Sequence, residues 1–322
     1  MQIPQLKIGK HQPRYPIIQG GMSVLVSNPS LATAVSNAGG IGTLGGTGVS
    51  PDEIYRMVSE ARKLTDKPLA INIMVAANNF LELVKASIRG GIDIIVAGAG
   101  ISKQLFQVCK EADVEVIPIV SSLRIGKFVE KMGASAIVVE SVEAGGHLGT
   151  DKTLDEIFSE IKQGMKIPVI AAGGLVDGND IGRMLMQGAD GVQLATRFVL
   201  SDECDVHDNY KKVYLDAKAE DITTIMSPVG YPGRAITTPF VERFAKEGKI
   251  PVPSCNQCLK SCSHTFCILD ALLKARDGNI NEGLFFSGQN VHRIDEILPV
   301  SSIMEKLVKE TQEFLATQDQ HQ

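Results

Sequence analysis

Short, almost uninterrupted runs of apolar residues recur along the first two thirds of the chain, and glycine or polar residues bound each of them. Runs of this length are too short for helices and are typical of buried strands. Eight such strands are predicted, at residues 17–19, 41–44, 69–74, 92–97, 114–120, 136–139, 168–171 and 191–194.

Helix start signals lie between these strands. Asn28-Pro29-Ser30, Ser50-Pro51 and Asp177-Gly178-Asn179 precede segments with helical spacing of apolar residues, which predicts helices over 31–37, 52–64 and 181–187. Strands that alternate with helices, each strand almost wholly apolar, form parallel sheets covered by helices. Eight such units within residues 1–200 favour an α/β fold closed into a (β/α)8 TIM barrel over an open doubly wound sheet.

The pattern changes after residue 200. The charged segment 202–221 is helix-like, segments 240–246 and 268–276 have helical spacing, and residues 301–317 are predicted as a terminal helix. We therefore divide the chain into a barrel of residues 1–200, a smaller unit of residues 201–300, and a C-terminal segment of residues 301–322 whose helix packs back on the barrel.

Composition and charge narrow the class of protein. With 44% hydrophobic and 21% charged residues, the 322-residue chain has the composition of an ordinary globular protein. Its net charge of -5 favours neither nucleic acid nor an anionic membrane as a partner. No apolar run reaches transmembrane length and residues 1–10 lack the pattern of a secretory signal, so we expect a cytoplasmic protein.

The loop after the sixth predicted strand carries the clearest candidate for catalysis. It reads Glu140-Ser-Val-Glu-Ala-Gly-Gly-His147-Leu-Gly. The active sites of α/β barrels lie at the carboxyl ends of the strands, and the two glycines before His147 let a flat ligand approach the backbone. A flexible turn with a surface histidine would also account for this loop taken alone.

Glycine and polar residues follow the other predicted strands, so a barrel would place them around the same mouth. Gly173-Gly174 and Ala195-Thr196 follow the seventh and eighth strands, from which barrels usually build a phosphate site. Gly173-Gly174 also precede a helix start, where free N–H groups and the helix dipole favour an anion. An ordinary turn and helix cap would place glycines there as well.

The sequence Gly40-Ile-Gly42-Thr-Leu-Gly45 spells the dinucleotide-binding pattern. That pattern needs a strand before it and a helix that opens inside it. Here it follows a helical segment and coincides with a predicted strand, so we expect small residues in a tightly packed strand and no dinucleotide fold.

Four of the six cysteines form a separate motif at Cys255, Cys258, Cys262 and Cys267. Thiolates at two- to four-residue spacing can surround an iron-sulfur cluster or a structural zinc ion, and His264 could replace one of them. We favour an iron-sulfur cluster, with zinc or redox-labile thiols as alternatives. Disulfides are not expected in a reducing compartment. The other two cysteines are isolated and are expected to be buried or incidental thiols.

Several motifs together resemble the nitronate monooxygenase (2-nitropropane dioxygenase) family, which includes the flavin-dependent type II enoyl-acyl-carrier-protein reductases. The resemblance rests on Pro16-Ile-Ile-Gln-Gly-Gly-Met22, Ala34-Val-Ser-Asn-Ala-Gly-Gly-Ile-Gly42, Asn72-Ile-Met74, Glu143-Ala-Gly-Gly-His147, Ala171-Ala-Gly-Gly174 with Asp177-Gly178, and Gln193-Leu-Ala-Thr-Arg-Phe198. It implies an FMN-binding barrel with a smaller lid domain inserted before the C-terminal helix. The four-cysteine motif is not part of the pattern of either well-known branch.

The resemblance also implies roles for single residues. His147 would be the catalytic residue. Gly21, Met22 and Asn72 would lie beside the isoalloxazine of FMN, with Gln193 near its edge. The residues that would hold the phosphate are Gly173, Gly174, Ala195 and Thr196, and the other cofactor-binding residues would be Gly20, Glu140 and Gly146.

Three hypotheses for the function follow. We favour an FMN-dependent oxidoreductase that oxidises alkyl nitronates or a related small substrate, with His147 as its catalytic residue. The second is an NAD(P)H-dependent enoyl-acyl-carrier-protein reductase that acts on an acyl thioester. The third is a flavin/iron-sulfur electron-transfer protein. The sequence leaves open the substrate, the choice of NADH or NADPH, and the oligomeric state, a homodimer included.

Overall fold

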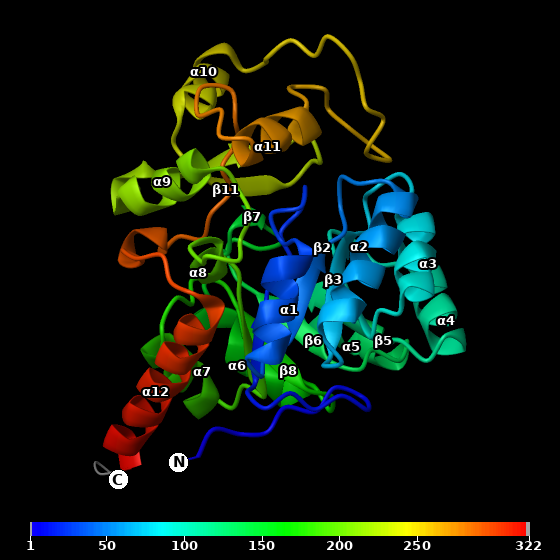
Figure 1. The fold of residues 1–322 in the computed structure, drawn as a ribbon, viewed down its shortest axis with the longest axis vertical. Helices are drawn as coiled ribbons and strands as arrows, with labels where there is room; N and C mark the ends of the chain where they lie inside the picture. Colours follow the sequence, from blue (N-terminus) through cyan, green and yellow to red (C-terminus); the bar gives the residue numbers. More distant parts are fainter. Residues whose placement is uncertain (1, 320–322) are drawn as a thin grey trace.

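The computed structural model describes residues 2–319, in which eight parallel strands curve into a nearly closed barrel (Figure 1). The strand order is β1-β9-β8-β6-β5-β4-β3-β2. A parallel bridge between Ile18 and Ile41 joins the two end strands. The barrel strands are β1 (Ile17–Gln19), β2 (Gly42–Gly45), β3 (Leu69–Met74), β4 (Ile94–Gly98), β5 (Glu115–Val120), β6 (Ile137–Glu140), β8 (Val169–Ala172) and β9 (Gly191–Leu194).

The predicted barrel is confirmed, because every predicted strand is present and no boundary differs from its prediction by more than two residues. Its strands are apolar on both faces, since one face packs inside the barrel and the other packs under helices. Ile94, Ile117 and Val138 belong to the inner cluster, whereas Ile95, Val116 and Val139 belong to the outer one.

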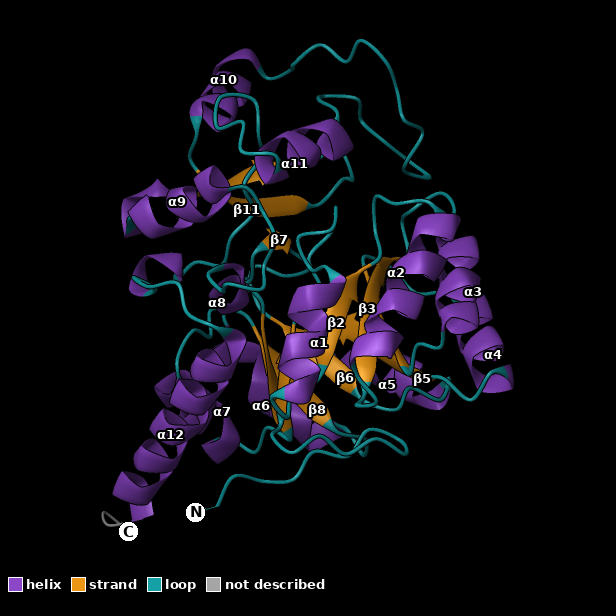
Figure 2. Cartoon of the chain, viewed as in Figure 1, coloured by secondary structure: helices purple, strands orange, loops and turns teal. Residues whose placement is uncertain are grey.

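Helices cover the outer face of the barrel (Figure 2). They are α1 (Pro29–Asn37), α2 (Pro51–Leu64), α3 (Phe80–Gly90), α4 (Lys103–Glu111), α5 (Leu123–Lys131), α6 (Leu154–Gly164), α7 (Gly178–Met186) and the short α8 (Thr196–Val199). The predicted start signals act as N-caps, since the side chains of Asn28, Ser50 and Asp177 accept hydrogen bonds from backbone N–H groups in the first turns of α1, α2 and α7.

The C-terminal helix α12 (Val300–Asp319) packs against α7, as predicted. Glycines on α7 permit the close approach, because a Cβ on Gly182 would lie 2.4 Å from the Phe314 ring. Residues 320–322 of the predicted C-terminal segment lie outside the described residues. No helix among residues 2–319 is both long and apolar enough to span a bilayer.

The glycines of the dinucleotide-like pattern lie within or next to β2, as expected. A Cβ on Gly42 would lie 1.7 Å from the Ala32 carbonyl oxygen, and a Cβ on Gly45 would lie 1.8 Å from that of Met22. The pattern therefore reflects close packing of β2 against neighbouring backbone.

Between α8 and α12 the chain forms a smaller layer over one end of the barrel, opposite both chain termini (Figure 1). Its elements are α9 (Asp208–Asp216), β10 (Ile222–Met226), β11 (Pro232–Ile236), α10 (Pro239–Glu247), α11 (Ile268–Arg276) and the 3-10 turns Ala219–Asp221 and Val291–Arg293. Phe240, Phe244 and Phe266 form part of a separate small core in this layer. Whether residues 201–300 are a distinct domain stays a prediction.

An antiparallel sheet that the apolar pattern did not predict ties this layer to the barrel. Its order is β10-β11-β7, and β7 (Gly146–His147) comes from the loop after β6. In the pairing of β11 with β7, Gly233 is opposite His147 and Arg234 is opposite Gly146. The hairpin of β10 and β11 therefore holds the segment that carries His147.

Candidate active site

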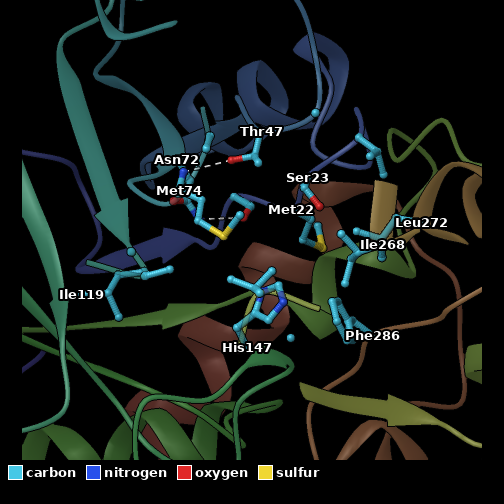
Figure 3. Close-up of a pocket in the computed structure, with 18 of the residues that line it drawn as sticks. Met22, Ser23, Thr47, Asn72, Met74, Ile119, His147, Ile268, Leu272 and Phe286 are labelled. Atoms are coloured by element: carbon cyan, nitrogen blue, oxygen red, sulfur yellow. Dashed lines mark hydrogen bonds between the residues drawn. The ribbon is translucent and has the colours of Figure 1, made fainter. Parts of the chain in front are cut away.

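A cavity of about 1080 Å³ lies at the carboxyl ends of the barrel strands, beneath the smaller layer. Figure 3 shows the His147 ring in this cavity, with Phe286 beside it and with Met22 and Met74 across from it. Ten of the twelve residues predicted to be catalytic or cofactor-binding line the cavity. They are Gly20, Gly21, Met22, Asn72, Glu140, Gly146, His147, Gln193, Ala195 and Thr196. The barrel thus brings distant loops together at one mouth.

His147 is held on two sides by the smaller layer. Its Nε2 lies 2.8 Å from the Ser227 Oγ, and Phe286 packs edge-on against the ring at 5.3 Å between centroids. Burial lowers the pKa of His147 to about 4, because the cavity wall disfavours the charged imidazolium. At neutral pH the imidazole is therefore uncharged, so it can exchange hydrogen bonds with a ligand without carrying a charge.

Glu140 ends β6 and faces the same cavity. Its carboxyl group has no hydrogen bond or ion pair to any other residue in the described part of the chain. Burial raises the pKa of Glu140 to about 7, since a carboxylate loses hydration there. A protonated carboxyl group can donate a hydrogen bond as well as accept one, so Glu140 can serve either kind of ligand atom near neutral pH.

The loop after β1 meets the end of β3 on the opposite wall. The Asn72 amide donates a hydrogen bond to the Gly21 carbonyl oxygen at 2.9 Å. A Cβ on Gly21 would lie 2.6 Å from the Asn72 Cβ, so only glycine fits at this approach. The backbone N–H of Met22 is already bound to the Ser27 Oγ at 2.8 Å. This wall is consequently fixed by its own hydrogen bonds.

Gly173 and Gly174 do not line the cavity. They lie behind the loop after β6, where a Cβ on Gly173 would lie 2.2 Å from the Ser141 Oγ and one on Gly174 would lie 2.9 Å from the Glu143 Cβ. The nearby start of α7 also carries two carboxylates, Asp177 and Asp180, and both form ion pairs with Arg293. The proposed role of these glycines at a phosphate stays a prediction.

Two features of the described residues fit a bound flavin mononucleotide. Gln193 is buried at the cavity wall and its Oε1 has no hydrogen-bond partner, as expected of a polar group that binds a ligand. The cavity volume also reaches the upper end of the roughly 300–1,000 Å³ range of sites for one small ligand. The cavity is therefore large enough for a ligand of the size of FMN.

The metal prediction for the four-cysteine motif is not supported. Within residues 2–319, no group of three or more His, Cys, Asp or Glu side chains is placed to hold a metal ion. Three of the sulfurs instead accept local hydrogen bonds. The donors are the Gln257 N–H to Cys255, the His264 N–H to Cys262 and the Asn256 amide to Cys267, at 3.4–3.5 Å. Within the described residues, the four cysteines are not joined in disulfides.

The loop with these cysteines closes one side of the cavity. It joins α10 to α11 and descends to the loop after β3 (Figure 1). The Asn78 N–H donates to the Cys258 carbonyl oxygen at 3.1 Å, and the Lys260 N–H donates to that of Ala76 at 3.0 Å. Cys258 and Leu259 line the cavity. The observed role of the motif is therefore to form part of the cavity wall.

Sequence reasoning missed several residues at or near the cavity. Ser227 lies in a turn-rich segment next to Pro228, where no pattern predicts a contact with a distant histidine. Phe286 follows α11 without a motif. Val24 and Leu25, after β1, have positive φ angles of 50° and 64°, and Val24 lines the cavity. Such strained backbone is found at functional sites, but a sequence alone does not show it.

Comparisons with known proteins agree with this geometry. A family profile described as nitronate monooxygenase matches residues 5–310. The chain is 32% identical over 237 residues to an octahydro-indene-carboxyl-CoA dehydrogenase of Rhodococcus jostii, a match that covers 74% of this chain and 67% of that protein. It is 26% identical to a probable nitronate monooxygenase of Staphylococcus saprophyticus, over 94% of this chain and 96% of the relative.

Solved structures show the same similarity. FabK from Thermotoga maritima superimposes with a TM-score of 0.86 and 33% identity, and the match covers 96% of each chain. A nitroalkane oxidase from Streptomyces ansochromogenes has a TM-score of 0.82 over 95% of this chain and 98% of that one. The two sequences are only 22% identical, so this match shows a shared fold and nothing about function.

Proposed function

This chain belongs to the nitronate monooxygenase family of flavin-dependent oxidoreductases, and within that family we propose that it reduces the double bond of an apolar α,β-unsaturated acyl thioester. FMN is typical of the family. When bound, FMN supplies the hydride chemistry of such a reduction, and the protein supplies position and electrostatics. NADH or NADPH is the proposed source of the reducing equivalents.

The observation that carries this proposal is the character of the cavity. Many of the side chains along it are apolar, among them Met22, Met74, Ile119, Ile268, Leu272 and Phe286 (Figure 3). Within the described residues, its charged lining side chains are the carboxylates Glu53 and Glu140. A small nitronate anion would meet no positively charged side chain there, because His147 is uncharged. A neutral, apolar acyl group suits these walls better.

His147 and Glu140 are the titratable groups placed to act on such a substrate. The uncharged His147 can form a hydrogen bond with a thioester carbonyl oxygen, which accumulates negative charge when hydride adds to the double bond. Glu140, with its pKa raised to about 7 by burial, can hold a proton near neutral pH. The loop with Cys258 and Leu259 would help to exclude water from the acyl chain.

Two relatives add support. FabK, an enoyl-acyl-carrier-protein reductase, is 33% identical to this chain over 96% of both chains. The Rhodococcus relative is named for a bulky carboxyl-CoA thioester. Both names describe acyl substrates, although neither fixes the acyl group or its carrier for this chain.

Anaerobic kinetics with the flavin-loaded protein test the proposal. We expect NADH or NADPH to bleach the flavin, and an enoyl thioester such as crotonyl-CoA or a longer homologue to restore its colour. Multiple turnovers would consume NAD(P)H in proportion to saturated thioester formed. Failure of every enoyl thioester to reoxidise the reduced flavin would contradict the proposal.

Oxidation of an alkyl nitronate is the second candidate, and the observation in its favour is the uncharged imidazole. A neutral histidine is in the protonation state that a general base needs. This candidate predicts oxygen consumption with nitronate and little bleaching of the flavin by NAD(P)H. The two candidates therefore differ in one anaerobic spectrum.

A further inference from the structure

The tip of the hairpin between β10 and β11 brings Ser227 to His147. Ser227 is 1% exposed and is anchored by its backbone, because its N–H donates to the Tyr231 carbonyl oxygen and its own carbonyl oxygen accepts from Gly230. Its Oγ lies 2.8 Å from the Nε2 of His147. Ser227 does not line the cavity, so it can act on a ligand only through the imidazole.

The hydrogen bonds of Ser227 decide which ring nitrogen carries the proton. The Oγ already accepts the Val229 N–H at 3.3 Å, and within residues 2–319 its only other partner is Nε2. If Nε2 donated to Oγ, the buried serine proton would have no acceptor, which costs about 1–3 kcal/mol. If the serine donates to Nε2, every group of the pair is satisfied.

The other nitrogen, Nδ1, faces a different environment. It makes no hydrogen bond within the described residues, and it is not among the buried unpaired polar atoms. Because His147 lines the cavity, Nδ1 is the nitrogen left for a ligand. With Nε2 accepting from Ser227, the proton of the neutral ring lies on Nδ1.

We propose that Ser227 is a positioning residue that fixes His147 as the Nδ1–H tautomer, which makes the cavity-facing nitrogen a hydrogen-bond donor to a substrate carbonyl oxygen. The substrate part of this inference rests on the proposed reduction of an acyl thioester. A neutral imidazole is a suitable donor, because it polarises a carbonyl without bringing a charge into an apolar cavity. The same tautomer has no free lone pair toward the cavity and is unsuited to act there as a base.

Nitrogen NMR of the oxidised, flavin-loaded protein tests the tautomer directly. Two-bond proton–nitrogen correlations distinguish a protonated ring nitrogen from a bare one, and the signals of His147 are those absent from H147A. We expect a protonated Nδ1 and a bare Nε2 at pH 7, both in the native protein and in S227T. We expect S227A to show a mixture of tautomers. A protonated Nε2 in the native protein, or an unchanged tautomer in S227A, overturns the proposal.

Kinetics separate positioning from a general effect on folding. We expect S227A to lower kcat for an enoyl thioester on the order of 10- to 100-fold with little change in KM, and S227T to restore most of it. The control is S87A, which removes another buried hydroxyl, one that bonds only within α3, and should leave kcat unchanged. Normal turnover by S227A contradicts the role of Ser227.

These readouts keep the two proposals apart. If the native protein reduces no enoyl thioester, the proposed function fails while the NMR result still decides the tautomer. If the protein reduces enoyl thioesters but carries its proton on Nε2, the function stands and the role of Ser227 is wrong. Should S227A not fold, the tautomer of the native protein alone supports or overturns the role of Ser227.

Discussion

Glu140 and His147 lie at the same cavity and only seven residues apart in the sequence, yet they belong to different sheets. Glu140 ends β6 of the parallel barrel, whereas His147 belongs to the antiparallel sheet of the smaller layer. Burial raises the pKa of Glu140 to about 7 and lowers that of His147 to about 4. A carboxyl group normally has a lower pKa than an imidazole, and burial in the same cavity reverses that order here.

This difference indicates that the two regions have different functions. The barrel end, with Gly21 and Asn72, forms a fixed wall on which the flavin is proposed to lie. The smaller layer brings a reactive side chain over that wall and orients it through Ser227 and Phe286. A change in the barrel end should therefore affect cofactor binding, and a change in the smaller layer should affect turnover.

The substitution His147→Ala should have the largest effect on turnover. We expect kcat to fall by about 10²- to 10⁴-fold, because no other described side chain takes the place of the imidazole. The flavin content should stay normal, since the opposite wall is untouched. Stopped-flow reoxidation of the reduced flavin by an enoyl thioester measures the first effect, and absorbance measures the second. Unchanged turnover of the enoyl thioester would contradict the catalytic role of His147.

The substitution Gly21→Ala should have the opposite profile. Its Cβ would lie 2.6 Å from the Asn72 Cβ and 2.9 Å from the Leu44 carbonyl oxygen, so the wall must shift, at a cost of about 1–3 kcal/mol. We expect flavin to be lost on purification and the urea midpoint to fall. The control is G126A in α5, where a Cβ meets a flexible Met165; it should keep its flavin. A flavin-replete G21A would refute the assignment of this wall.

The shifted pKa values of Glu140 and His147 should make the free energy of unfolding depend on pH. For Glu140 the folded pKa is raised, so its contribution to stability is present below its ordinary pKa of 4.5 and is lost as pH rises to about 7. For His147 the folded pKa is lowered, so its contribution is present above 6.5 and is lost as pH falls to about 4. The two trends oppose each other across overlapping windows.

The substitution Glu140→Gln removes one of these trends. The native protein should lose stability as Glu140 ionises between pH 4.5 and 7, and E140Q should not. We therefore expect the free energy of unfolding of E140Q minus that of the native protein to grow over this range by on the order of 1–3 kcal/mol. Urea titrations of the flavin-loaded proteins at several pH values measure it. A constant difference across this range would mean that the carboxyl group is ionised normally.

The sequence alone predicted the carboxyl end of the barrel far better than it predicted the smaller layer. The strands of a parallel sheet are continuous apolar runs, and glycines such as Gly42 lie where backbones touch. Because barrel topology brings all strand ends to one mouth, the loop from Glu140 to His147 and the pair Ala195-Thr196 could be placed at the cavity from the strand pattern. The other predicted residues that line it came from the family resemblance.

The smaller layer could not be predicted in this way. The hairpin of β10 and β11 is short, and Pro228, Pro232 and Gly230 make the segment resemble a turn. The contact of Ser227 with His147 spans 80 residues, and local periodicity carries no information on such a pairing. Local spacing also suggested a metal site at the four-cysteine motif, which the arrangement of the described residues does not support.

Removal of any bound metal should have the smallest effect on stability and turnover. The loop around Cys258 is docked by backbone bonds to the Asn78 region and by the Lys260 ammonium on the Val75 carbonyl oxygen at 2.7 Å, and none of these contacts needs a metal. We expect dialysis against a chelator, or serine at Cys255 and Cys262, to change the free energy of unfolding by no more than about 0.5 kcal/mol, with turnover unchanged. Elemental analysis of the native protein is the check. If the native protein contains stoichiometric iron or zinc and loses turnover together with it, then a metal held by the cysteine loop is needed for turnover. The orientation of His147 by the hairpin would then not be sufficient.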